Sequence, residues 1–113
     1  MGRFVNFYEG NLDWEWKFWF GIQCSNFGSI LQMVADEDVY VDRYIGEDGE
    51  YIRLDADKEK LLEKLKSLKI DSCPSCGDTE CLTATREMVK DFTEAVEKCD
   101  ENKVFAIFFV EYL

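Results

Sequence analysis

The feature that most constrains the fold of this chain is a strict alternation of apolar and other side chains over residues 12–22. Every even-numbered position in this stretch is apolar, in the order Leu12, Trp14, Trp16, Phe18, Phe20 and Ile22. Successive side chains of a strand point to opposite faces of a sheet, so the pattern predicts one long strand with a buried face. We expect this aromatic stripe to belong to the core, and a ligand cleft lined by Trp14, Trp16 and Phe18 is the alternative interpretation.

Four other stretches have the composition of strands. They are residues 3–8, 39–45, 51–54 and 104–113. The middle two are joined by the link Gly-Glu-Asp-Gly at positions 46–49, whose Asp-Gly pair favours a hairpin. The last stretch is almost entirely apolar, which predicts a central strand that is buried on both faces.

Three segments have the apolar spacing of helices. A short helix is expected over residues 30–34, a second after a cap at Asp55 or Asp57, and a third over about residues 83–99. Together with the strands, these helices predict one compact α+β domain over residues 1–113. In this domain a largely antiparallel sheet of about five strands carries the two long helices on one face.

The absence of histidine excludes several kinds of chemistry. The 113 residues include no His, so the chain cannot use Ser-His or Cys-His nucleophilic catalysis or build a histidine-containing metal site. General acid–base catalysis near neutral pH most often relies on His. We therefore expect a protein that is not an enzyme.

The charge of the chain bears on its partners. Twenty-four acidic residues against thirteen basic ones give a net charge of −11. Contacts to phosphate groups require Lys and Arg, so direct binding to nucleic acid or to an anionic membrane surface is disfavoured. No apolar run approaches the roughly 20 residues of a membrane helix.

The acidic excess is concentrated in residues 36–57. This segment holds nine acids and two bases, a net of −7. A solvated hairpin face explains such a run, and a docking surface for a basic protein partner is the functional interpretation. The side chains predicted for that interaction surface are Asp42, Glu47, Asp48 and Glu50. An acidic inhibitor that imitates nucleic acid is a further alternative.

Three of the five cysteines lie within nine residues, and their spacing is that of a metal-binding loop. The segment Cys73-Pro-Ser-Cys76-Gly77 resembles the knuckle of zinc-ribbon and rubredoxin-like sites. That resemblance implies a zinc ion held by Cys73 and Cys76. Cys81 is close enough in sequence to be a third ligand. Cys24 is the expected fourth ligand if the first long strand ends beside the loop, and Asp71 or Asp78 is the alternative as an oxygen ligand. Cys99 falls on the apolar stripe of the third helix, about 21 Å from its start, and is not expected to take part.

Two other interpretations of the cysteine loop stay open. Cys-Pro-x-Cys resembles a glutaredoxin motif, which implies a thiol-dependent redox factor or enzyme that uses Cys73 and Cys76. Against it, Pro74 is the only proline, so the cis-proline that faces such a dithiol is missing. Alternatively, the loop is a turn rich in small residues whose thiols are free or form an incidental disulfide.

The amino-terminal residues show no apolar core of a signal peptide. Clustered cysteines in a reducing compartment favour metal or thiol chemistry over structural disulfides. We therefore expect an intracellular, cytoplasmic protein: a small acidic interaction module that is stapled by a cysteine-bound zinc ion.

Overall fold

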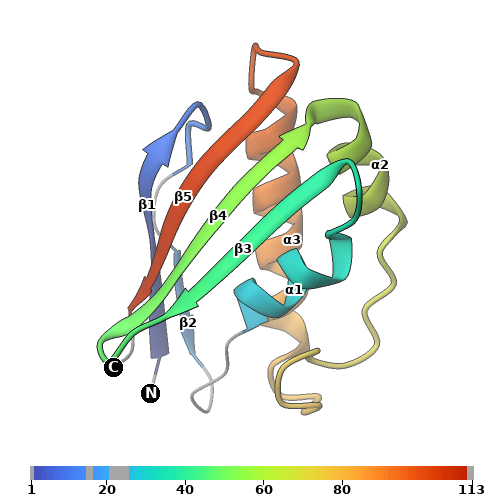
Figure 1. Ribbon diagram of the computed structural model, residues 1–113. Coiled ribbons are helices and arrows are strands. Elements are labelled where there is room, and N and C mark those ends of the chain that lie inside the picture. The colour runs from blue at the N-terminus through green and yellow to red at the C-terminus, as the bar shows by residue number, and fades with distance from the viewer. Residues whose placement is uncertain (1, 15–16, 21–25, 112–113) are drawn as a thin grey trace.

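The structure is a computed structural model of the chain, and it describes residues 2–14, 17–20 and 26–111, with side chains over 5–14 and 26–111. Five strands and three helices follow one another along these residues (Figure 1). In chain order they are β1 (Gly2–Gly10), β2 (Lys17–Phe20), α1 (Asn26–Val34), β3 (Val39–Ile45), β4 (Gly49–Asp57), α2 (Lys58–Ser67), α3 (Leu82–Glu97) and β5 (Lys103–Glu111). None of the described helices is long and apolar enough to cross a membrane.

The five strands form one sheet in the order β2-β1-β5-β4-β3, and every neighbouring pair is antiparallel. The last strand of the chain, β5, thus lies at the centre. Strands β3 and β4 form the predicted hairpin, which is closed by a hydrogen bond of 2.8 Å from the amide of Gly46 to the carbonyl of Gly49. The predicted α+β class and the antiparallel sheet are confirmed.

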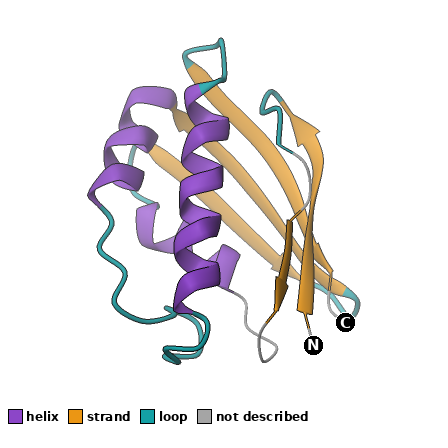
Figure 2. Ribbon diagram, turned by 180° about the vertical axis from the view of Figure 1, so that it is seen from behind, coloured by secondary structure: helices purple, strands orange, loops and turns teal. Residues whose placement is uncertain are grey.

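All three helices lie on the same face of the sheet, as Figure 2 shows from the side of the helices. The helix α2 begins at the predicted cap, because the carboxylate of Asp57 accepts a hydrogen bond of 3.2 Å from the amide of Lys60. Its Leu61 and Leu65 are buried one turn apart. The two long helices on one face are therefore confirmed, and the short helix α1 joins them.

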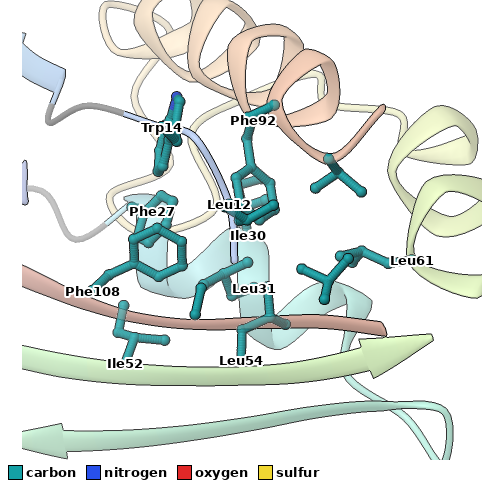
Figure 3. Packing of buried hydrophobic residues seen from close by; sticks show 14 of the residues in the cluster. Leu12, Trp14, Phe27, Ile30, Leu31, Ile52, Leu54, Leu61, Phe92 and Phe108 are labelled. Carbon is teal, nitrogen blue, oxygen red and sulfur yellow. The ribbon is translucent and has the colours of Figure 1, made fainter. Parts of the chain in front are cut away.

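The core between helices and sheet is built around an aromatic cluster (Figure 3). The ring of Trp14 lies 5.3 Å from that of Phe27, 5.2 Å from Phe92 and 5.4 Å from Phe108, measured between centroids. Contacts of this kind contribute about 0.5–1.5 kcal/mol each beyond the area that they bury. The cluster joins the segment after β1 to α1, α3 and β5, so it ties both layers together.

The prediction of one long strand over residues 12–22 was wrong in the part that the structure describes. Residues 12–14 are irregular, and the strand β2 covers only residues 17–20. After β1 the amide of Asn11 donates to the carbonyl of Phe105, and the side chain of Asn11 accepts from the amide of Phe105, both at 2.9 Å. These bonds lie at the end of the pairing between β1 and β5. The side chains of Leu12 and Trp14 nevertheless reach the core.

The alternative interpretation of this stretch was a ligand cleft lined by Trp14, Trp16 and Phe18. Trp14 is a core residue in the structure. Trp16 and the side chain of Phe18 lie outside the described residues.

The prediction that the last strand is buried on both faces was also wrong. Along β5, Val104, Ala106, Phe108 and Val110 are buried. The alternate residues Phe105, Ile107 and Phe109 are half-buried. The reason is that the helices cover only one face of the sheet, so the apolar side chains of the other face stay in contact with solvent.

Candidate metal centre

The cysteine loop, residues 68–81, connects α2 to α3 and turns back on itself at Gly77. Gly77 has φ of 73°, in the left-handed region that glycine adopts without steric cost. Its amide donates a hydrogen bond of 2.8 Å to the carbonyl of Cys73. This turn brings the two ends of the Cys-x-x-Cys segment to the same side of the loop.

The sulfur atoms of Cys73, Cys76 and Cys81 lie within 4.8 Å of one another. Cys76 Sγ and Cys81 Sγ lie 3.5 Å apart. Zinc binds thiolate sulfur at about 2.3 Å in tetrahedral geometry, so two ligating sulfurs lie about 3.8 Å apart. The 3.5 Å separation is slightly shorter than that value and the 4.8 Å limit is longer, so small side-chain adjustments would let the three thiols hold one ion.

The three thiols differ in their exposure. Cys73 and Cys81 are buried and form a small cluster apart from the main core, whereas Cys76 is exposed. Cys81 immediately precedes α3 and is its N-cap residue. A metal binds the thiolate form of a cysteine, which loses its proton on coordination.

Hydrogen bonds hold the backbone on both sides of the cluster. The buried hydroxyl of Thr85 donates to the carbonyl of Cys81 at 2.8 Å and accepts from Nδ2 of Asn26 at 3.1 Å. At the other side, Nε and Nη2 of Arg86 donate to the carbonyl of Ile70 at 3.2 and 2.9 Å. The first residue of α1 is thereby linked to the loop. The bond between Asn26 and Thr85 was not predicted, because no local pattern marks a contact between residues so distant in the chain.

The structure also bears on the fourth ligand. Among the described residues no carboxylate joins the three sulfurs, which leaves Asp71 and Asp78 of the same loop outside the group. Cys99 lies buried in the main core beyond the far end of α3, as expected. Cys24, the predicted fourth ligand, lies outside the described residues.

The predicted acidic surface needs one correction. Asp42, Glu47 and Asp48 are exposed. Glu50 is only 1 % exposed and forms an ion pair with Arg43. Its place in β4 explains this, since Glu50 has the same strand parity as the buried Ile52 and faces the helices. Glu50 is therefore a structural residue and not part of the contact surface.

Comparison of the chain with protein-family models, with curated proteins and with solved structures finds no match. Function is therefore inferred from the geometry of the site.

Proposed function

We propose that this protein is a small acidic interaction module whose cysteine loop is held by a zinc ion. The observation that carries the proposal is the convergence of three thiols from one loop to within 4.8 Å of one another. Thiolates are the ligands that zinc prefers in structural sites. In a chain without histidine, cysteine is the only strong zinc ligand available.

The role of the ion in this proposal is structural. The cysteine loop joins two helices that pack on the same face of the sheet, and its three sulfurs come from its middle and its end. An ion there closes the loop and fixes the start of α3, where Thr85 is hydrogen-bonded to Asn26 of α1. We retain Cys24 as the proposed fourth ligand, since it precedes Asn26 by only two residues in the sequence.

Metal analysis of the purified chain tests the zinc site. We expect one zinc ion per chain by native mass spectrometry, and a thiolate-to-metal absorption band when cobalt replaces zinc. Cys73→Ser and Cys81→Ser should lose the ion, Cys24→Ser should bind it more weakly, and the matched control Cys99→Ala should retain it. Metal-free protein that reversibly loses two protons in mild oxidant would instead favour the redox interpretation.

The interaction surface of the proposal is the exposed part of the acidic hairpin. Asp42, Glu47 and Asp48 project into solvent from a chain with net charge −11, so their field favours a basic protein partner. A reducing intracellular compartment suits both the thiols and such a partner.

A lysine-rich peptide serves as the probe for this surface. Its affinity should fall when Asp42→Asn, Glu47→Gln and Asp48→Asn are combined, and the difference should shrink as salt rises. A control variant with the same charge change on α3, Glu87→Gln, Glu94→Gln and Glu97→Gln, should bind much as the parent does. Equal losses in the two variants would show that net charge alone attracts the peptide.

A further inference from the structure

The face of the sheet opposite the helices is covered by no described element. Figure 1 looks onto this face, with the strands in front of the helices. Aromatic side chains are exposed on it to an unusual degree. Tyr44 is 72 % exposed, Tyr8 66 %, Tyr40 54 % and Tyr51 41 %. Exposed aromatic groups gathered on one face mark an interaction surface more often than they mark a purely solvated one.

These side chains form an ordered array, because the strand register aligns them. Tyr44 on β3 pairs with Tyr51 on β4, which in turn pairs with Phe109 on β5. The rings of Tyr51 and Phe109 lie 4.8 Å apart, and the ring of Tyr8 from β1 lies 5.9 Å from that of Tyr51. A row of rings thus crosses the sheet, and we call it the aromatic row.

The same face already holds one guanidinium group over a ring. The Cζ atom of Arg53 on β4 lies 5.5 Å from the ring centroid of Phe105 on β5. Arg53 is in register with Asp42 on β3, so an acid and an aromatic ring lie on its two sides. At such sites the cation is more often Arg than Lys, because the planar guanidinium stacks on a ring and is more weakly hydrated than an ammonium group.

Arg53 neighbours Tyr51 on this face of β4, but its guanidinium group lies over Phe105 and not over a ring of the aromatic row. The exposed carboxylates of Asp42 on β3 and Glu111 on β5 lie on the same face, at the next position of that face along their strands. A cation that stacks on Tyr44 or Tyr51 would meet these carboxylates nearby. Phosphate groups, and a second copy of a chain with net charge −11, would meet repulsion instead.

We infer that this open face binds an extended, arginine-containing basic segment of a partner protein, with guanidinium groups stacked on the aromatic row. The inference rests on the proposed interaction function and adds to it a place on the sheet and a side-chain preference. An extended segment presents alternate side chains to one face, so arginines at every second position would reach the row together.

The test uses two labelled ten-residue peptides, one alternating Arg with Gly and one alternating Lys with Gly. At 150 mM salt we expect the full-length chain to bind the Arg peptide at least about fivefold more tightly than the Lys peptide, as two stacked guanidinium groups imply. Tyr44→Leu with Tyr51→Leu should abolish that preference and leave affinity for the Lys peptide unchanged. The control Met33→Leu, on the exposed side of α1, should keep it.

A thermal unfolding curve shows whether the double variant is folded. If it is not, the single variant Tyr44→Leu replaces it in the binding measurements. Equal affinities of the parent for both peptides would overturn the inference while leaving the acidic interaction module intact, provided that both peptides still respond to the hairpin substitutions. Binding of neither peptide would overturn both proposals. A dimer of the free chain that dissociates in Tyr44→Leu, or a single-stranded oligonucleotide that binds this face, would assign the face to a different occupant and overturn the inference.

Discussion

Arg43 donates two hydrogen bonds to Glu50 across the β3–β4 hairpin, from Nε at 3.1 Å and from Nη2 at 2.8 Å. The side chain of Glu50 is 1 % exposed and that of Arg43 is 25 % exposed, so the pair lies at the boundary between core and solvent. A carboxylate that is buried to this extent requires such a paired, forked partner.

We predict that the two partners are unequal in their effect on stability. Arg43→Met leaves the buried carboxylate of Glu50 without its partner and should cost about 3 kcal/mol of unfolding free energy. Glu50→Gln keeps hydrogen-bonding capacity beside a partly exposed Arg43 and should cost about 1–2 kcal/mol. The double variant, Arg43→Met with Glu50→Leu, should recover much of the loss because it removes both charges together. Urea unfolding of the parent and the three variants checks the order, and a double variant less stable than Arg43→Met alone would contradict the coupling.

Gly28 gives a second, linked prediction. A Cβ at this position of α1 would lie 2.9 Å from Nη2 of Arg43 and would collide with the carboxylate of Glu50. Replacing a helical glycine by alanine ordinarily stabilises by up to about 1 kcal/mol, but here Gly28→Ala should destabilise by about 1–2 kcal/mol because the pair must shift. In the background of Arg43→Met with Glu50→Leu, the penalty should shrink. An unchanged penalty in urea unfolding would mean that the pair is not its cause.

Features that depend on neighbouring residues could be predicted from the sequence, whereas the burial of Glu50 could not. Helix stripes are local, so they were predicted correctly from spacing alone, and the cap was narrowed to Asp55 or Asp57, of which the structure shows Asp57. Cys81 was predicted beside Cys73 and Cys76 because the loop between them is short. Glu50 was predicted to lie on the exposed surface, because the predicted strand began at Tyr51 and its charge suggested a solvated position. The longer strand β4 and the partner Arg43 explain its burial.

The pairing of strands that are distant in the chain could not be predicted from local sequence patterns. The pairing of β1 with β5 joins the two ends of the chain, and nothing near either strand encodes the choice of partner. The alternation over residues 12–22 identified Leu12 and Trp14 as buried but not the irregular backbone that carries them. A loop can bury apolar side chains as well as a strand can. The alternation therefore does not determine which residues form the hydrogen bonds of the sheet.

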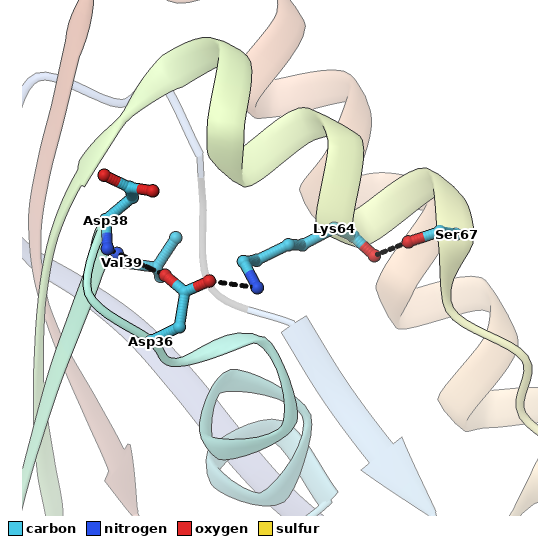
Figure 4. A network of polar contacts seen from close by, with 5 residues as sticks. All are labelled: Asp36, Asp38, Val39, Lys64 and Ser67. Atoms are coloured by element: carbon cyan, nitrogen blue, oxygen red, sulfur yellow. Dashed lines mark hydrogen bonds and ion pairs between the residues drawn. The ribbon is translucent and has the colours of Figure 1, made fainter.

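Asp36 joins three elements, and its ionisation should affect stability (Figure 4). Its Oδ1 accepts hydrogen bonds from the amides of Asp38 at 2.8 Å and Val39 at 3.1 Å, while Oδ2 pairs with the ammonium group of Lys64 on α2. The hydrogen bond from Lys64 is the main cause that lowers the pKa of the Asp36 carboxyl. Desolvation opposes it, and the two amide bonds act in the same direction as Lys64, so the net effect on the pKa is downward.

Because the pKa of Asp36 is lower in the folded state, its contribution to stability is complete above the unfolded pKa of about 4 and is lost as the pH falls through the folded value. We therefore expect Asp36→Asn to lower the melting temperature relative to the parent at neutral pH, and the two to converge as the pH falls below the folded-state pKa of Asp36. Lys64→Met should show a smaller loss with the same trend, since the two amide bonds remain. Circular dichroism melts across this range provide the measurement, and a difference that is independent of pH would contradict the assignment.

Gly77 tests whether the backbone of the cysteine loop prepares the metal site. A Cβ at Gly77 would meet no atom within 4 Å, so any effect of Gly77→Ala arises from its φ of 73° and not from a clash. The left-handed conformation costs an L-residue roughly 1–2 kcal/mol, and Asn tolerates it better than Ala does. We expect zinc affinity to fall about fivefold to thirtyfold in Gly77→Ala and by less in Gly77→Asn. Competition with a zinc chelator measures both, and equal affinities for the parent and Gly77→Ala would show that the turn at Gly77 does not position Cys73 and Cys76 for the ion.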